Sequence, residues 1–423
     1  MGILKFRIII HFIFFSFLLF LKSETTYSQN DYPYTEYSDY HYIRYDKNKI
    51  IFPGDSSDFQ NLFSKLDTLI LKGEKKINIV HFGGSHIQAG IYSGVCRKKM
   101  QNFYPGLNGG RGMIFPYGMS KTYTPKNYRI KWTGEWKTCR NVEHKNCTLG
   151  MLGIEATTED SAASITVTLN SSYQKYETDI IKIFHDTAED TYKIKLLADS
   201  TSYKITEFTD DGYTLIKTEN FLNSVKLQIL KTDTSQHRFT LYGIDFENSF
   251  SGIVYTDAGI SGASLPSFLK CNLLEKQMSV MNPDLVIISI GTNDTYVNTF
   301  YPERYKKHYI EFLNRIKKAV PDAAILLTVP NDCYFHRRNP LPFTEDAEKV
   351  ILELAKQYNC GVWDFYQVMG GYNSSYLWHK DKLMQNDLIH FTKKGYIIKG
   401  NLLFNAILKI YDIHIEEDAS KIF

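Results

Sequence analysis

The pattern of apolar and polar positions divides the chain into three stretches. Between residues 61 and about 120, the helical period in NLFSKLDTLILKG, a strand ending at Phe82 and a helix after Ser85 are typical of α/β structure. From about 126 to 250, short alternating runs such as SITVTLN, DIIKIFH and SVKLQILK are separated by Asp, Ser, Gly and Asn clusters, which predicts an antiparallel β-sandwich. After residue 250 the α/β texture returns.

The last stretch predicts a parallel sheet. Its expected strands are GIVYTDAG, PDLVIISIG, AAILLTV and GVWDF, and its expected helices cover residues 265–280, 302–319, 343–358 and 393–411. Strands that alternate with helices form a parallel sheet with both faces covered. We therefore expect one α/β domain, made of residues 29–125 and 251–423, which is interrupted by a β-sandwich at residues 126–250.

The first residues follow a different pattern. Lys5 and Arg7 precede an apolar run from Ile8 to Leu21, and small polar residues follow near Ser28. This is the plan of a secretory signal peptide, which we expect to occupy residues 1–28 and to be removed. The run is shorter than the roughly 20 residues that span a bilayer, so no stable membrane span is expected after cleavage. The sequence thus predicts a periplasmic, secreted or cell-surface protein.

Composition narrows the function classes. The 423 residues are 43% hydrophobic and 22% charged, with a net charge of +3, which is an ordinary globular balance that argues against a nucleic-acid partner. Six cysteines are too few for a disulfide-built scaffold in a chain of this size. Cys139 and Cys147 are close enough in sequence to close a hairpin, and two free thiols are an equally good interpretation.

Polar residues follow the predicted parallel strands. Four short motifs contain these residues. Ser85 lies in FGGSH, Gly262 in GISGAS and Asn293 in IGTND, and NDLIHFT contains Asp387 three residues before His390. Ligands gather outside the carboxyl ends of the strands in an open parallel sheet. These residues therefore provide a hydroxyl, a base, a carboxylate and oxyanion donors, which is a complete set for acyl transfer.

Each residue type suits one role. A serine hydroxyl is a weak nucleophile and needs an adjacent base, which His390 can provide while Asp387 orients its ring. The backbone N–H groups of Ser85 and Gly262 and the side-chain amide of Asn293 can bind the oxyanion. Taken singly, each is more simply a turn or helix-cap residue, and their joint occurrence favours catalysis.

At these residues the sequence resembles the SGNH (GDSL-type) hydrolase superfamily, whose four blocks contribute Ser, Gly, Asn and His in this chain order. The resemblance implies a flavodoxin-like three-layer α/β/α fold and ester hydrolysis without a metal or other cofactor. GLNGGRGMIFPY and the stretch from 363 to 396 look like a secreted bacterial branch that includes peptidoglycan and other carbohydrate O-acetylesterases. Some of that branch carry an inserted carbohydrate-module-like β-sandwich. The expected partner is therefore an acetylated glycan polymer.

One position departs from the superfamily pattern. Gly84 stands where the first block usually has aspartate, so the serine loop lacks the hydrogen bonds of that side chain and is expected to be more flexible. This leaves open a catalytically dead glycan-binding protein, and a lipase or thioesterase is the alternative among enzymes. GGSHI also lacks the final glycine of a nucleophile elbow, which disfavours an ordinary α/β-hydrolase.

A few residues near the expected site could contact a substrate. His86 follows the serine and is expected to be structural or to line the pocket, because no metal-ligand spacing surrounds it. Arg111 could reach an anionic group on a glycan, although a structural arginine is commoner. Trp378 is near the expected base in sequence and could line the pocket. Trp132 and Trp136 could stack on sugar rings, although core positions are more usual.

Overall fold

The computed structural model describes residue 34 and residues 40–169, 174–198 and 201–420. By their contacts, Tyr40–Phe423 form one unit, and the description below concerns that unit. The predicted signal peptide, residues 1–28, lies outside the described residues. Among the residues that are described, no helix is both long enough and apolar enough to cross a membrane.

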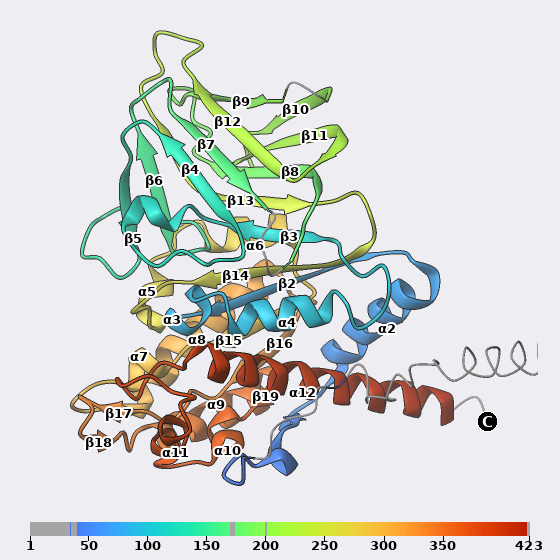
Figure 1. The fold of residues 1–423 in the computed structure, drawn as a ribbon, viewed down its shortest axis with the longest axis vertical. Helices are drawn as coiled ribbons and strands as arrows, with labels where there is room; N and C mark the ends of the chain where they lie inside the picture. Colours follow the sequence, from blue (N-terminus) through green and yellow to red (C-terminus); the bar gives the residue numbers. More distant parts are fainter. Residues whose placement is uncertain (1–33, 35–39, 170–173, 199–200, 421–423) are drawn as a thin grey trace, which may run out of the picture. The chain divides into compact units, whose positions relative to one another are not determined.

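A six-stranded sheet forms the centre of the α/β part (Figure 1). Its order is β1-β19-β16-β15-β2-β14, and every neighbouring pair except β1 with β19 is parallel. The strands are β1 (Ile50–Ile51), β2 (Lys76–Gly83), β14 (Gly252–Gly259), β15 (Leu285–Ser289), β16 (Ala324–Thr328) and β19 (Gly361–Trp363). All residues of β14 and β16 are buried, as expected where both faces of a sheet are covered.

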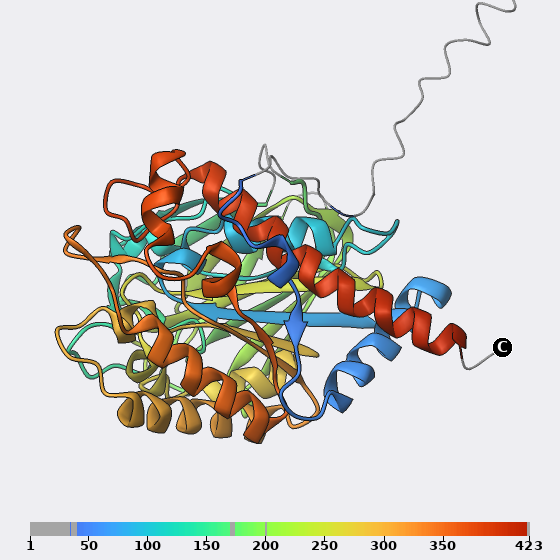
Figure 2. The same cartoon turned by 90° about the horizontal axis from the view of Figure 1, so that it is seen from below.

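Helices cover the two faces of this sheet. α4 and α12 pack together on one face, and α8 and α9 lie on the other (Figure 2). The helices are α2 (Ser57–Lys72), α3 (Ser85–Gln88), α4 (Tyr92–Met100), α5 (Leu265–Leu269), α6 (Leu274–Met281), α7 (Thr292–Thr295), α8 (Pro302–Ala319), α9 (Thr344–Tyr358), α10 (Phe365–Met369), α11 (Ser374–Lys380) and α12 (Lys393–Ser420), with short 3-10 helices at Tyr45–Lys47 and Tyr117–Ser120. The predicted three-layer α/β/α fold is confirmed.

The single helix predicted at residues 265–280 is two helices, α5 and α6. At the break, the Arg315 guanidinium donates to the carbonyl of Leu269 at 2.9 Å. The N–H of Leu273 donates to the carbonyl of Leu149, in the predicted insert, at 3.0 Å instead of continuing the helix. Partners from distant segments therefore satisfy the backbone groups that one continuous helix would pair internally.

Antiparallel strands lie between residues 110 and 247. One sheet has the order β10-β11-β8-β13-β6-β5, with β3 also paired to β13, and the other has the order β4-β7-β12-β9. The strands are β3 (Gly110–Ile114), β4 (Arg129–Thr133), β5 (Lys137–Arg140), β6 (Ile154–Thr158), β7 (Ser164–Thr168), β8 (Thr178–His185), β9 (Lys193–Leu197), β10 (Tyr203–Phe208), β11 (Tyr213–Leu222), β12 (Ser224–Leu230) and β13 (Phe239–Glu247); β17 (Tyr334–Phe335) and β18 (Asn339–Pro340) form a separate hairpin. These sheets fit an insert domain, and its predicted boundaries at 126 and 250 stay a prediction.

The antiparallel sheets join the α/β part closely. Gly112 of β3 has φ +79°, and a Cβ there would lie 2.7 Å from the Tyr255 carbonyl oxygen of β14, so the two backbones approach closely only because glycine stands between them. Side chains from both parts belong to one buried hydrophobic cluster. Cys139 and Cys147 form a disulfide bond in the insert, and the other four cysteines are free and buried.

Candidate active site

Ser85 lies just past the carboxyl end of β2, on the first turn of α3. The chain turns sharply here, since a Cβ on Gly83 would overlap the side chain of Ile87. Because the strand is buried and Ser85 is partly exposed, the turn presents the hydroxyl at the edge of the sheet. The first residues of a helix have N–H groups with no acceptor inside that helix, and the N–H of Ser85 is one of them.

Asp387 and His390 are held by a turn that precedes α12. Asp387 Oδ1 accepts the N–H groups of Ile389 and His390, both at 2.9 Å. Asp387 Oδ2 lies 2.7 Å from His390 Nδ1, and His390 Nε2 lies 2.7 Å from Ser85 Oγ. The structure therefore brings the three predicted residues into one hydrogen-bonded chain.

The charge of Asp387 decides how protons are arranged along this chain. Burial raises the pKa of Asp387, but hydrogen bonds from the His390 ring and from the N–H groups of His390 and Ile389 outweigh burial and lower it to about 2. The carboxylate is thus ionised at neutral pH and accepts the proton on His390 Nδ1. His390 Nε2 is then the acceptor for the Ser85 hydroxyl, which is the arrangement of a base beside a nucleophile.

Gly262 lies on the loop that follows β14, and Asn293 lies in α7, the short helix that follows β15. Gly262 has φ +85°, a conformation that favours glycine, and the nearest atom to a Cβ placed there is Val142 Cγ1 at 3.8 Å. Asn293 Nδ2 donates one hydrogen to the Ala263 carbonyl at 2.9 Å. A primary amide carries two such hydrogens, so the second can serve an oxyanion near Ser85.

Residues 232–398 match the model of the GDSL-like Lipase/Acylhydrolase family, a range that includes Gly262, Asn293, Asp387 and His390. This part of the chain is an SGNH (GDSL-type) acylhydrolase domain. Over these residues the chain is therefore similar to a family of carboxylic ester hydrolases. No curated protein matches the sequence.

Solved structures place the SGNH part and the antiparallel sheets in one fold. A structure described as "Peptidoglycan O-acetylesterase in action, 5 min" matches 86% of this chain and 99% of its own, with 19% identity and a TM-score of 0.70. The lipase/acylhydrolase from Enterococcus faecalis matches 37% of this chain and 76% of its own, with 24% identity and a TM-score of 0.31. The acetyl xylan esterase AlAXEase matches 37% and 81%, with 19% identity and a TM-score of 0.30. The first of these shows a shared fold that extends across most of this chain.

Within this SGNH site, Gly84 has little room for a side chain. A Cβ on Gly84 would lie 3.0 Å from Asn293 Nδ2 and 3.4 Å from the Ala263 carbonyl oxygen. The Asn293 amide therefore occupies the space into which the usual aspartate of the first SGNH block would extend. Greater flexibility of the serine loop stays a prediction, whereas the close approach of the amide is a structural reason for glycine at this position.

Two of the predicted substrate contacts are wrong. Arg111 is 1% exposed, and its Nη2 donates to Asp257 Oδ2 and to Asn127 Oδ1, both at 3.2 Å. Trp378 is 0% exposed, and its Nε1 donates to the carbonyl of Met369 at 2.9 Å. Both side chains are engaged inside the protein, so neither can reach a substrate.

His86 packs behind His390, the expected base. Trp132 and Trp136 differ from each other in exposure. The ring of His86 is buried, lies 5.2 Å from the ring of His390, and has Nδ1 2.9 Å from the Tyr396 hydroxyl. Burial lowers the pKa of His86 well below its usual range, so its ring is neutral and fits the structural interpretation. Trp132 is 40% exposed and remains available for stacking, whereas Trp136 packs against the core.

Two further residues support the site without having been singled out in the sequence. Gln88 Oε1 accepts the N–H of Ser261 at 2.5 Å. The Asp294 carboxylate accepts the N–H of Leu265 at 3.1 Å. Both bonds hold the loop that carries Gly262. Their only sequence signal is position, since Gln88 follows Ser85 by three residues and Asp294 directly follows Asn293.

Proposed function

We propose that the protein is a serine esterase that removes O-acetyl groups from a carbohydrate polymer. The observation that carries this proposal is the hydrogen-bonded chain from Ser85 through His390 to Asp387, with both links at 2.7 Å, in an SGNH-type fold. We further propose that it acts in the periplasm, at the cell surface or outside the cell, after removal of residues 1–28 as a signal peptide.

The proposed reaction has two stages. Ser85 Oγ attacks the acetyl carbonyl while His390 Nε2 takes the hydroxyl proton, and His390 returns that proton to the sugar oxygen as the ester bond breaks. Water then attacks the acetyl-serine with His390 again as the base, and acetate leaves as Ser85 regains its proton. Asp387 holds the His390 ring in the required tautomer and stabilises its positive charge.

We assign three donors to the expected oxyanion. They are the N–H of Ser85, the N–H of Gly262 and the second hydrogen of the Asn293 amide. Asn293 is fixed in place because its first hydrogen is bonded to Ala263, so it costs little reorganisation when charge develops. Loss of the amide is expected to lower kcat by about 10²- to 10³-fold.

Two observations support a glycan as the source of the acetyl group. The structure similar over 86% of this chain is described as a peptidoglycan O-acetylesterase, and that similarity includes the antiparallel sheets as well as the SGNH part. Tyr123 is 45% exposed, and its carbonyl accepts a hydrogen bond from Gln88, three residues after Ser85, at 2.7 Å. An exposed aromatic ring beside the site suits the apolar face of a pyranose.

The test is acetate release by residues 29–423 from acetylated peptidoglycan and from acetylated xylan. Ser85→Ala is expected to lower the rate by about 10³-fold or more on whichever polymer is cleaved. Ser249→Ala, which changes an exposed serine outside the site, serves as the matched control and should leave the rate unchanged.

Other outcomes would point to the alternative functions. Activity that rises with acyl length on aryl esters, without release from either polymer, would replace the proposal with a lipase or thioesterase. Polymer binding equal in wild type and Ser85→Ala, with no release from any ester, would indicate a glycan-binding protein without catalysis.

A further inference from the structure

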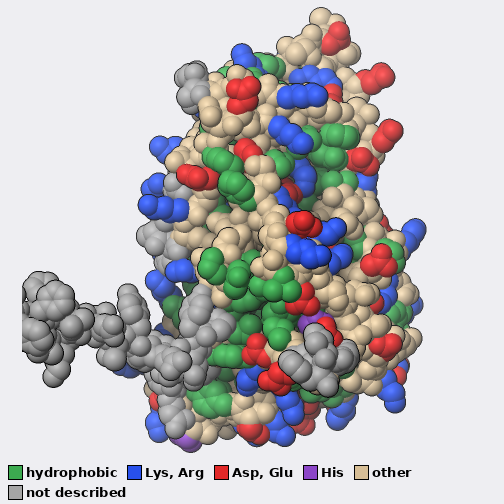
Figure 3. All heavy atoms as spheres, turned by 90° about the vertical axis from the view of Figure 1, so that its right-hand side faces the viewer, with side chains coloured by type: hydrophobic (Ala, Val, Ile, Leu, Met, Phe, Trp, Pro, Cys, Tyr) green, Lys and Arg blue, Asp and Glu red, His purple; other side chains and the backbone are tan. Residues whose placement is uncertain are grey.

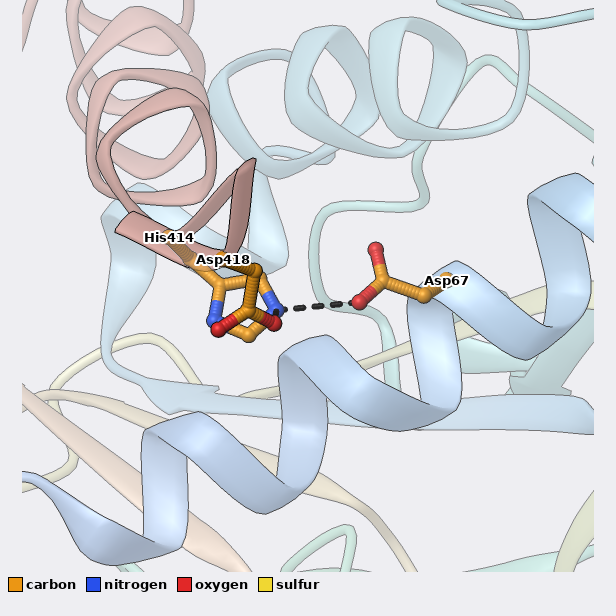
Figure 4. Close-up of side chains that lie close together, drawn as sticks. All are labelled: Asp67, His414 and Asp418. Carbon is orange, nitrogen blue, oxygen red and sulfur yellow. Dashed lines mark hydrogen bonds and ion pairs between the residues drawn. The ribbon is translucent and has the colours of Figure 1, made fainter. Parts of the chain in front are cut away.

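Three potential metal ligands meet where the end of α12 crosses α2. His414 and Asp418 are one helical turn apart on α12, and Asp67 reaches toward them from α2 (Figure 4). One ligand atom from each residue can be chosen so that all three lie within 4.8 Å of one another. We infer that Asp67, His414 and Asp418 bind a divalent transition-metal ion, with Zn²⁺ best suited to one imidazole and two carboxylates.

The distances agree with those of a shared ion. His414 Nε2 lies 2.9 Å from Asp67 Oδ2 and 3.6 Å from Asp418 Oδ2. With Zn–N and Zn–O bonds of about 2.1 Å, two ligands of a tetrahedral site are separated by about 3.4 Å. The cluster therefore needs only shifts of a few tenths of an ångström along these two edges to surround an ion. Water would complete the coordination.

Proton counting also favours a cation here. A neutral imidazole has at most one hydrogen on Nε2, so this atom can donate to one carboxylate oxygen at a time. Two carboxylates nevertheless approach the same nitrogen. A metal ion would bind all three atoms at once, with deprotonated Nε2 as its nitrogen ligand and release of the proton to solvent.

The surroundings hold the ligands in place. The Tyr411 hydroxyl donates to Asp67 Oδ1 at 2.6 Å, which turns Oδ2 toward His414. The His414 ring stacks on Tyr411 with an interplanar angle of 21° and also contacts the ring of Phe63 at 5.4 Å. Hydrogen bonds to ligating carboxylates and packing around a ligating histidine are the features that orient metal ligands in proteins.

The local charge attracts cations. The last part of α12 carries four carboxylates, at Asp412, Glu416, Glu417 and Asp418, which outnumber the two flanking lysines, Lys409 and Lys421. The side chain of His414 is only 11% exposed, whereas those of Asp67 and Asp418 are 30% and 50% exposed. An ion can therefore enter from solvent and bind a histidine already in position.

This site is separate from the catalytic one. His414 lies 21 residues after Lys393, the first residue of α12, which corresponds to about 32 Å along the helix. The turn with His390 precedes that first residue. A bound ion would thus fasten the end of α12 to α2 without touching the esterase chemistry, and its detection does not depend on the proposed function.

The experiment is calorimetric titration of Zn²⁺ into residues 29–423 after removal of metals with a chelator. We expect one Zn²⁺ per chain and a rise in Tm with Zn²⁺ that Mg²⁺ does not produce, because magnesium prefers oxygen ligands alone. His414→Ala and Asp418→Asn should each raise the Kd for Zn²⁺ by about tenfold or more. Asp418→Asn changes a half-exposed side chain, so the test survives if His414→Ala fails to fold.

Glu416→Gln is the matched control for charge, since it removes one carboxylate from the same helix end but not from the cluster. It should change the Kd less than twofold. No Zn²⁺ binding by wild type, or the same Kd in wild type and Asp418→Asn, would show that the three residues form only an ion-pair cluster.

Discussion

Gly84 illustrates how one missing side chain shapes the site. The superfamily pattern has aspartate at this position. From sequence alone, the absence of that side chain predicts a more flexible serine loop, because the loop lacks its hydrogen bonds. In the structure the Asn293 amide lies only 3.0 Å from where a Cβ of residue 84 would be, so the glycine leaves room for the amide that we propose as an oxyanion donor. The departure from the pattern therefore fits an adapted site better than a decayed one.

The prediction at this position is that a larger residue lowers activity. Gly84→Ala should lower kcat by about 10-fold or more, because the methyl group pushes the Asn293 amide away from the oxyanion, and Gly84→Asp should restore the usual motif but lower activity further. Measured kcat and KM on an aryl acetate would check this. Gly94→Ala in α4, where an added Cβ would make ordinary contacts, is the control. Higher activity in Gly84→Asp would contradict the argument.

The residues that meet at the candidate site could be predicted from sequence, and some of their neighbours could not. Ser85, Asn293, Asp387 and His390 each follow a recognisable strand or lie in a short motif, so their order along the chain carries the information. The burial of Arg111 depends on a carboxylate 146 residues away, and no local pattern reports such a partner. Its interpretation as a substrate contact was wrong for that reason.

At the scale of elements, two consecutive residues after β15 hold the loop after β14. Asn293 bonds the Ala263 carbonyl, and the Asp294 carboxylate accepts the N–H of Leu265, the first residue of α5. The strands could be predicted from their apolar runs, whereas this link between loops could not, because it depends on which strand ends become neighbours. The split between α5 and α6 escaped prediction for the same reason, since its partners are distant in sequence.

Asp294 makes this link dependent on pH. Its burial raises the pKa to about 7, and hydrogen bonds from Leu265 and its own N–H only partly oppose this effect. An unfolded aspartate has a pKa of about 4, so the folded chain binds more protons between pH 4 and 7 and loses stability as pH rises through that window.

Asp294→Asn removes this titration while keeping an oxygen that can accept from Leu265. The free energy of unfolding of the variant, relative to wild type, should therefore increase by about 2 kcal/mol between pH 5 and pH 8. Urea unfolding of both proteins at the two pH values measures this difference, and any constant structural cost of the substitution cancels. A relative stability that does not change with pH would show that Asp294 does not titrate in the folded chain.

At the scale of the whole molecule, the antiparallel sheets and the α/β part share buried polar contacts as well as a core. Asp257 of β14 accepts from Arg97 of α4 at 2.7 Å and from Arg111 of β3 at 3.2 Å. Arg97 also donates to the hydroxyl of Tyr176, in the predicted insert, at 3.1 Å. One buried carboxylate thus links the two parts of the chain.

Residues of both parts also lie together on one side of the molecule. This is the side toward which α2 and the end of α12 extend. Hydrophobic side chains gather near the middle of this face (Figure 3). A cleft of about 640 Å³ is lined from the α/β part by Leu69 and Tyr104 and from the insert by Phe221. The rings of Phe221 and Phe250, both within the predicted insert, stack at 5.2 Å beside this cleft. Both parts therefore contribute apolar side chains to this cleft.

These links predict that the two parts unfold together and that Asp257 is central to their coupling. Burial raises the pKa of Asp257, but the charges of Arg97 and Arg111 outweigh burial and lower it, so its contribution is present above the ordinary carboxyl pKa and is lost as pH falls. Asp257→Asn leaves two buried guanidinium groups without a counter-charge and should destabilise the fold by about 3–5 kcal/mol at pH 7. Calorimetry should show one transition in wild type and in the variant, at a lower Tm in the variant.

Asp190→Asn, which removes an exposed partner of Arg238, is the control and should lower the free energy of unfolding by less than about 1 kcal/mol. Two separate transitions in wild type would mean that the insert and the α/β part fold independently despite their shared core.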